Sequence, residues 1–305
     1  MEALLEAAVR LAAPLLLAAL GELVVQRAGI VNIGIEGMML CGAFAAFAVA
    51  APSDSPALGA AAAVGAGVLA AGLFAAFAVG RKADQIVVGT ALNLLALGAT
   101  GLALRSLYAA GPPTAPLAPE WAVPGLAALP FAGPVLFQQS VFVYAAAALA
   151  LGVGLFLART RAGLRLRAVG EMARAADAEG VRVDAVRAAA LLFGGACAGL
   201  AGAVLTLSQS NTFTEGMTAG RGFIALAIVI FGRWSAPGVA GAALFFGLAS
   251  ALQFRLQARG VALPYPVFLM FPYAVTLAVL AFSASGARAP ADLGRPYRRE
   301  ARGVG

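Results

Sequence analysis

The sequence predicts an all-α polytopic membrane protein with about eight transmembrane helices and a short broken or re-entrant segment. Three observations lead to this prediction: 62% of the 305 residues are hydrophobic, only 11% are charged, and the apolar residues form long continuous runs. Soluble domains carry about 25% charged residues, so this chain cannot cover its surface with charge in water. The strands of a membrane β-barrel would alternate in polarity over about ten residues, which these Ala-, Leu- and Gly-rich runs do not.

The predicted spans follow from the length of the apolar runs. A helix needs about 20 apolar residues to cross the hydrocarbon. The first run is expected to stay in the protein, because Met1-Glu2-Ala3 lacks the positive charge that opens a signal peptide. The eleven residues from Gly222 to Gly232 are too few for a straight crossing and indicate a broken helix. The expected spans are 4–25, 31–51, 56–80, 85–104, 138–158, 188–208, 235–254 and 263–284.

Arginines set the expected orientation of these spans. Seven arginines lie in the segment 159–187, and five more lie between Arg288 and Arg302. The positive-inside rule places both segments in the cytoplasm, with Arg81-Lys82 on the same side and residues 109–137 outside. Seven of the sixteen prolines fall in that outer stretch, which predicts an irregular loop. The net charge of +7 is therefore explained by membrane topology, without nucleic acid as a partner.

The composition also excludes several kinds of catalytic, metal-binding and nucleotide-binding site. The chain has no histidine, which excludes His-based triads and His-ligated metals. Its two cysteines, Cys41 and Cys197, lie in separate apolar runs and offer no thiolate cluster. Its lysine, Lys82, is followed by Ala83, so the phosphate-binding Gly-Lys-Ser/Thr pattern is missing. We expect no catalytic residues, no metal site and no cofactor in this chain, and any ATP to be used by other subunits.

Polar side chains at membrane depth are the candidates for a solute path, because such groups are costly unless they are paired or hydrated. One cluster, at 21–37, places Glu22, Asn32 and Glu36 among helix-breaking glycines. The other, at 209–222, places Asn211 and Glu215 before the short apolar segment. Interrupted segments in corresponding halves of a chain are typical of an internally repeated transporter. The predicted path residues are Asn32, Glu36, Asn93, Asn211 and Glu215.

Each of these residues also has a purely structural interpretation. Glu36 could pair with Arg27 or cap a helix. Asn93, in the middle of the run 85–104, could form an interhelical hydrogen bond. Both clusters could be polar surface loops, which suits the stretch from Gln209 to Glu215 better than Asn32 and Glu36, because apolar residues surround these two on both sides.

The basic segment 159–187 contains a predicted helix that suits a docking partner. Residues Glu171 to Glu179 are good helix formers, and Gly180 is a plausible stop. A loop that only connects two spans needs no helix, so docking is favoured over a solvated surface helix.

Several stretches of the sequence resemble those of a known family. Ala175-Ala176, followed after three residues by Gly180, resembles the core of the coupling loop in permease subunits of ATP-binding-cassette importers, although Arg174 replaces the usual Glu. Residues 27–39 (RAGIVNIGIEGMM), 218–227, 230–234 and 295–299 resemble the nucleoside branch of the sugar and branched-chain amino acid permeases. The similarity extends over about residues 14–300.

The resemblance implies a multi-pass subunit of the bacterial inner membrane, with residues 1–305 forming one transmembrane permease domain and a cytoplasmic tail at 286–305. Its implied partners are cytoplasmic ATP-binding subunits, a second identical or homologous permease chain, and an extracytoplasmic solute-binding protein. The implied solute is a nucleoside or a related simple sugar. The coupling helix would present Glu171, Arg174, Ala175, Ala176 and Gly180 to the ATPase. The alternative is an ion-coupled secondary transporter that uses Glu22 and Glu36.

Overall fold

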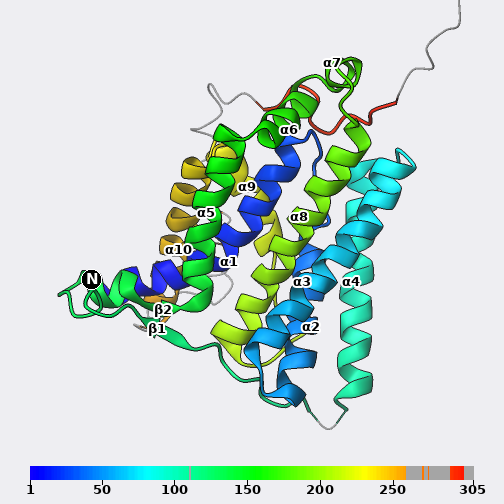
Figure 1. Ribbon diagram of the computed structural model, residues 1–305. Coiled ribbons are helices and arrows are strands. Elements are labelled where there is room, and N and C mark those ends of the chain that lie inside the picture. The colour runs from blue at the N-terminus through cyan, green and yellow to red at the C-terminus, as the bar shows by residue number, and fades with distance from the viewer. Residues whose placement is uncertain (110, 259–269, 271–273, 275–288, 299–305) are drawn as a thin grey trace, which may run out of the picture.

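Seven helices in the described part of the chain are long and apolar enough to cross a membrane. The computed structural model describes residues 1–109, 111–258, 270, 274 and 289–298. Within them the all-α prediction is confirmed (Figure 1). The long helices are α1 (Glu2–Arg27), α2 (Ile35–Ser53), α3 (Pro56–Ala75), α4 (Gln85–Leu107), α5 (Val141–Arg159), α8 (Val183–Val204) and α10 (Ala236–Ala258). The eighth expected span, 263–284, lies outside the described residues except for Met270 and Ala274.

The shorter elements lie between these spans. Helices α6 (Arg161–Glu171) and α7 (Ala173–Ala178) follow α5, and α9 (Arg221–Phe231) is the short helix predicted at 222–232. Strands β1 (Glu120–Ala122) and β2 (Gln138–Ser140) pair antiparallel, with Trp121 opposite Gln139. Among the described residues, π-helical turns occupy Ala76–Gly80, Gly133–Phe137 and Leu205–Ser210, so that α3 and α8 continue for another turn.

Local sequence explains where several helices begin. The side chain of Asp84 accepts hydrogen bonds from the amides of Ile86 and Val87, which caps α4. Ser55 caps α3 in the same way, and Pro56 occupies its first position. Helix α2 begins at Ile35, later than the predicted 31, because residues 28–34 form a turn in which Gly29 has a φ of +85°. That turn is the first interrupted segment.

Glycines bring α8 into direct backbone contact with three other helices. A Cβ atom added at Gly67 of α3 would overlap the carbonyl oxygen of Gly195, and one added at Gly42 of α2 would overlap Gly199. On α1, a Cβ at Gly21 would lie 2.6 Å from the Cβ of Cys197. Close packing of small residues is the main source of helix association in lipid. The glycines of α8 therefore have a packing role, because a side chain there would push the helices apart.

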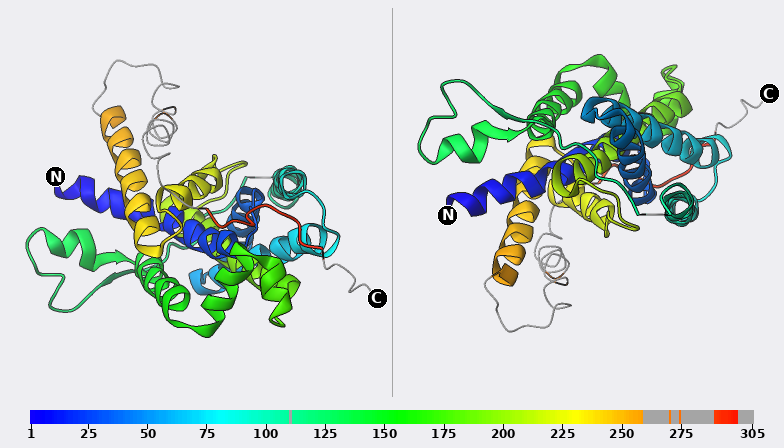
Figure 2. Two further views of the ribbon diagram at one scale, coloured as in Figure 1. Left: turned by 90° about the horizontal axis from the view of Figure 1, so that it is seen from above. Right: turned by 90° about the horizontal axis from the view of Figure 1, so that it is seen from below.

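The packing leaves α1, α2 and α8 largely buried, while α3, α4, α5 and α10 keep exposed apolar faces. Viewed along the bundle, α4 and α10 lie at opposite edges (Figure 2). Exposed leucines on α4, among them Leu94, Leu95 and Leu102, give that helix an outer surface suited to lipid or to another apolar partner.

The basic segments gather at one end of the molecule. Helices α6 and α7 and the tail 289–298 lie together there, and the β1–β2 hairpin and the proline-rich stretch lie toward the other end (Figure 1). Lys82 joins the basic end through an ion pair with Asp184 at the start of α8. The predicted irregular loop at 109–137 is present, with β1 and one π-helical turn as its only regular pieces among the residues described there.

Candidate functional site

The first interrupted segment, residues 28–34, is held by a buried polar network. The Glu22 carboxylate on α1 accepts a hydrogen bond from the Gln26 side chain at 3.0 Å and one from the Asn32 backbone amide at 3.3 Å. The indole of Trp234, which follows α9, donates to the Gln26 side chain at 2.7 Å. Glu22, Gln26 and Asn32 are all buried. This network therefore fixes the turn against both α1 and the end of α9.

Asn93 of α4 fixes the other end of the same segment. Its amide nitrogen donates to the Ile33 carbonyl at 2.9 Å, and its amide oxygen accepts from the Gly37 amide at 2.8 Å. Gln85, at the start of α4, accepts from the Val31 amide at 2.9 Å. The structure thus shows the interhelical hydrogen bonds that were the structural interpretation of Asn93. It brings the side chain of Asn93 on α4 to the turn that contains Asn32.

Glu36 joins the first interrupted segment to the second. Its two carboxylate oxygens accept hydrogen bonds from the amides of Gly220 and Gly222, at 2.8 Å and 2.7 Å. These amides lie at the N-terminus of α9, where a carboxylate is favoured by the exposed N–H groups and the helix dipole. Gly222 is needed here because an added Cβ would lie 2.7 Å from the Glu36 Cα. Of the two structural interpretations of Glu36, the helix cap is the one that the structure shows. Glu36 does not pair with Arg27.

The second interrupted segment, residues 211–220, is more exposed. Asn211 has a φ of +52°, and its carbonyl accepts a hydrogen bond from the Ala115 amide at 2.7 Å. Glu215 forms a bidentate ion pair with Arg105, whose Nε and Nη2 donate to the two carboxylate oxygens at 2.8 Å and 3.0 Å. The hydrogen bond from the Arg105 guanidinium holds the pKa of Glu215 below its usual value. The surface-loop interpretation therefore describes Glu215 well, and the structure does not bring Asn211 or Glu215 into the bonds around Glu36.

Two atoms of the site have no protein partner in the described chain. The side-chain nitrogen of Asn32 lies 3.4 Å from the Met38 sulfur, while its oxygen is buried without a hydrogen bond among the described residues. One oxygen of Glu22 is in the same state. Buried polar atoms of this kind carry a desolvation cost that a water or a solute hydroxyl would relieve.

The coupling segment, residues 159–187, differs from the prediction in its helix boundaries. The expected single helix from Glu171 to Glu179 is wrong: Glu171 ends α6, and α7 begins at Ala173. The break arises at Met172, whose φ of −153° is not helical. Arg174, Ala175 and Ala176 lie on α7, where Ala176 is buried and the other two are exposed.

The predicted stop at Gly180 is confirmed. Gly180 has a φ of +83°. Its amide donates to the Asp177 carbonyl, and the next amide, of Val181, donates to the Ala176 carbonyl. These two bonds form a Schellman motif, which requires a left-handed residue at this position.

The coupling segment lies directly against the first interrupted segment. A Cβ added at Gly170 of α6 would overlap the carbonyl oxygen of Arg27 and lie 3.2 Å from the Gly29 amide nitrogen. The Arg27 guanidinium donates to the Trp234 carbonyl at 2.8 Å and lies 4.0 Å from the Glu171 carboxylate. Helix α6 therefore contacts the turn at 28–34 directly, and Arg27 lies between Glu171 of α6 and Trp234, which follows α9.

Comparison with known proteins identifies the family. Residues 4–280 match the model of the branched-chain amino acid transport system permease component. The chain belongs to this permease family. The guanosine ABC transporter permease protein NupQ of Bacillus subtilis is 36% identical, over 94% of this chain and 93% of its own length. The nucleoside ABC transporter permease protein NupC of Lactococcus lactis is also 36% identical, over 93% of each chain.

A third relative is named for a sugar and not for a nucleoside. The putative glucose ABC transporter permease protein TsgC13 of Haloferax volcanii is 36% identical over 97% of this permease and 98% of its own length. No solved structure matches the chain. The resemblance to permease subunits of ATP-binding-cassette transporters is confirmed by the family and by these relatives.

Two charged side chains that were not predicted as site residues form hydrogen bonds to the coupling segment and to the turn at 28–34. Asp292 of the tail accepts a hydrogen bond from the Ala173 amide at 2.7 Å, and its own amide donates to the Gly170 carbonyl at 2.9 Å. Arg187 of α8 is buried and donates to the carbonyls of Ala28 and Arg295. A signal for Asp292 was available, because it is an acid among the five arginines of the basic tail.

Proposed function

We propose that this permease is the membrane subunit of an ATP-binding-cassette importer for nucleosides in the bacterial inner membrane, with its basic end in the cytoplasm. The solute class is supported by the similarity over nearly the whole chain to a guanosine permease and a nucleoside permease. The location of both arginine-rich segments at one end supports the orientation. Cytoplasmic ATP-binding subunits, a second permease chain and an extracytoplasmic binding protein complete the proposed assembly.

The observation that carries the mechanism is the meeting of the two interrupted segments at Glu36. A transport path needs backbone that is free of regular helix and lies within the protein. Glu36, Asn32 and Asn93 lie at or bond to such backbone, so we assign the path to this junction. Asn211 and Glu215 would line its continuation toward the proline-rich end. Nucleosides are polar and uncharged, and a relay of amides and carboxylates offers them hydrogen bonds without a deep binding well.

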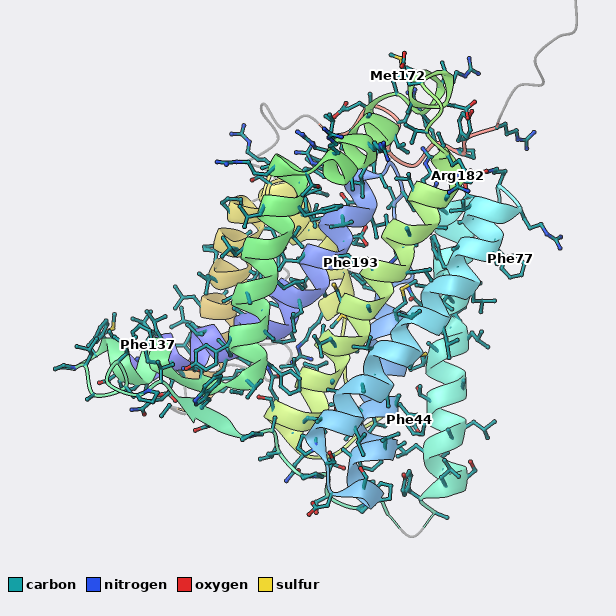
Figure 3. The ribbon with its side chains drawn as sticks, in the orientation of Figure 1. Phe44, Phe77, Phe137, Met172, Arg182 and Phe193 are labelled. Atoms are coloured by element: carbon teal, nitrogen blue, oxygen red, sulfur yellow. The ribbon has the colours of Figure 1, made fainter. Side chains whose placement is uncertain are left out.

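Coupling to ATP would run through α6 and α7. Met172 is 60% exposed at the tip of the basic end (Figure 3). Arg174 and Ala175, which follow it on α7, are exposed as well. An ATPase that moved this tip would move Gly170, which touches the turn at 28–34. That turn carries the bonds to Glu22 and Asn93. The two states of the path would then differ in how this turn and α9 are held.

Uptake by the assembled transporter in proteoliposomes tests the proposal. We expect uptake of guanosine and uridine that requires ATP and persists when proton and sodium gradients are collapsed. Glucose is the second candidate solute because of the similarity to TsgC13, and excess unlabelled glucose is the competitor that separates the two. Uptake that follows an ion gradient without ATP would instead support the secondary transporter and refute the importer.

A further inference from the structure

An apolar groove opens between α5 and α8. Its volume is about 500 Å³. Val24 of α1 forms its floor, and Leu166 of α6 closes its basic end. Its walls come from α5 and α8, and Figure 3 shows Phe193 on the side of α8 that faces α5. The wall residues include Leu149, Gly152, Val153 and Phe156 of α5 and Ala190 and Phe193 of α8.

The basic end of the groove continues into a second, polar cavity. Arg165, Val186 and Ala189 line both, and the second cavity has a volume of about 390 Å³. Arg182 and Glu179 also line it. The side chains of Arg165 and Arg182 are exposed and have no ion pair with any acid of the described chain. Two arginines and one glutamate leave this mouth with a positive charge.

An apolar groove with a positively charged mouth fits an amphiphile that has an anionic head group. We propose that the groove binds an anionic phospholipid, with an acyl chain between α5 and α8 and its phosphate at Arg165 and Arg182. Basic pockets between transmembrane helices bind anionic head groups in this manner. A polar solute such as a nucleoside would find almost no hydrogen-bonding surface on the apolar walls.

The position of the groove gives the lipid a structural role. Its closing helix, α6, also carries Gly170, which touches the turn at 28–34. Its floor, α1, carries Glu22 of the polar network. A bound lipid would therefore contact the two helices that connect the coupling segment to the first interrupted segment. This inference is independent of which solute the permease carries.

A glycine in the wall allows the groove to be filled. A Cβ added at Gly152 would meet no atom within 4 Å, so the side chain of Gly152→Leu has room to start into the groove, and leucine improves the helix propensity of α5. Gly98 of α4 is equally open and lies outside the groove, so Gly98→Leu is the matched control. The measurement is native mass spectrometry of the full chain in detergent with equal amounts of phosphatidylglycerol and phosphatidylcholine. We expect wild type and Gly98→Leu to retain phosphatidylglycerol and Gly152→Leu to lose it.

The mouth is tested by charge removal. The double variant Arg165→Gln and Arg182→Gln should lose about fivefold in preference for phosphatidylglycerol per arginine. Arg81→Gln, at the basic end but away from the groove, should retain the preference. Variants are compared only after they show a monodisperse elution peak and a melting temperature in phosphatidylcholine no lower than that of wild type.

Three results would overturn the proposal. Wild type could bind both lipids equally, which would reduce the groove to ordinary bilayer contact. Gly152→Leu could retain as much phosphatidylglycerol as Gly98→Leu, which would place the lipid elsewhere. Gly152→Leu could change the oligomeric state and leave lipid binding unchanged, which would assign the groove to a second copy of the chain.

Discussion

At the scale of the residue, Glu36 joins two segments that are 184 residues apart in the sequence. Its carboxylate replaces the missing partners of two amides at the start of α9. Glu215, the other acid predicted to lie on the path, forms an exposed ion pair, and such pairs contribute little to stability. The two glutamates therefore provide a matched comparison.

We expect Glu36→Gln to lower both thermal stability and uptake. The amide leaves one N–H of α9 without an acceptor, at a cost of about 1.5–3 kcal/mol for a bond to a charged group. Glu215→Gln should leave the melting temperature in detergent almost unchanged. Thermal unfolding followed by size-exclusion chromatography gives the comparison. Equal stability of the two variants would show that the Glu36 bonds do not hold α9.

At the scale of the element, contact between glycines determines how α3 packs on α8. Gly65 and Gly67 lie two residues apart on α3 and have opposite surroundings. A Cβ at Gly67 would overlap the Gly195 carbonyl, and one at Gly65 would meet no atom within 4 Å. The two positions therefore distinguish packing from intrinsic helix propensity.

Gly67→Ala should separate α3 from α8 and reduce the yield of folded protein. Overpacking of this kind costs about 1–3 kcal/mol, and more where only backbone atoms can move. Gly65→Ala should be neutral or stabilising, because alanine favours the helix by up to about 1 kcal/mol over glycine. Monodisperse yield after solubilisation is the measurement, and a similar yield for both variants would contradict the packing account.

The stop of α7 depends on backbone conformation alone. A Cβ at Gly180 would meet no atom within 4 Å, so the only cost of a side chain comes from its φ of +83°. Gly180→Val should leave the chain folded but lower ATP-driven uptake, because a left-handed conformation costs about 1–2 kcal/mol for such a residue. Gly180→Asn should fall between wild type and Gly180→Val, since asparagine tolerates this region. Normal uptake by Gly180→Val at normal expression would remove this role.

Elements were predictable from the sequence where a single continuous pattern defined them. Seven of the expected spans and the short helix α9 were found because their apolar runs match the length of a crossing. The turn at 28–34 was assigned in part to a helix, since Val31 and Ile33 are as apolar as the residues of α2. Helix α6 was missed because its arginines were interpreted as charge that sets topology. Partners such as Gly220 for Glu36 follow from tertiary packing, and no local pattern indicates them.

At the scale of the whole molecule, the tail 289–298 connects the coupling segment to the core. Asp292 bonds to both Gly170 and Ala173, and the Gly294 amide donates to the Gly29 carbonyl at 3.0 Å. Arg187 of α8 donates to Ala28 and Arg295 and so joins the tail to the same turn. Three parts of the chain that are distant in sequence are therefore bonded together at the basic end.

We expect Asp292→Ala to uncouple ATP hydrolysis from uptake while leaving membrane insertion intact. The variant loses the bond to the Ala173 amide and weakens the attachment of α7. Arg295→Gln is the control, because it removes only an exposed ion pair with Asp292. The ratio of ATP hydrolysed to solute taken up in proteoliposomes should rise for Asp292→Ala and stay constant for Arg295→Gln. A constant ratio in both would show that the tail plays no part in coupling.

The capping of α9 has a consequence for charge selection. A helix N-terminus left open attracts carboxylates and phosphates, and broken helices in transporters bind anionic solutes in this way. In this permease a glutamate side chain already fills that place. An amino acid or a nucleotide that entered the junction would meet a charge of the same sign as its own acidic group, and a neutral molecule would not.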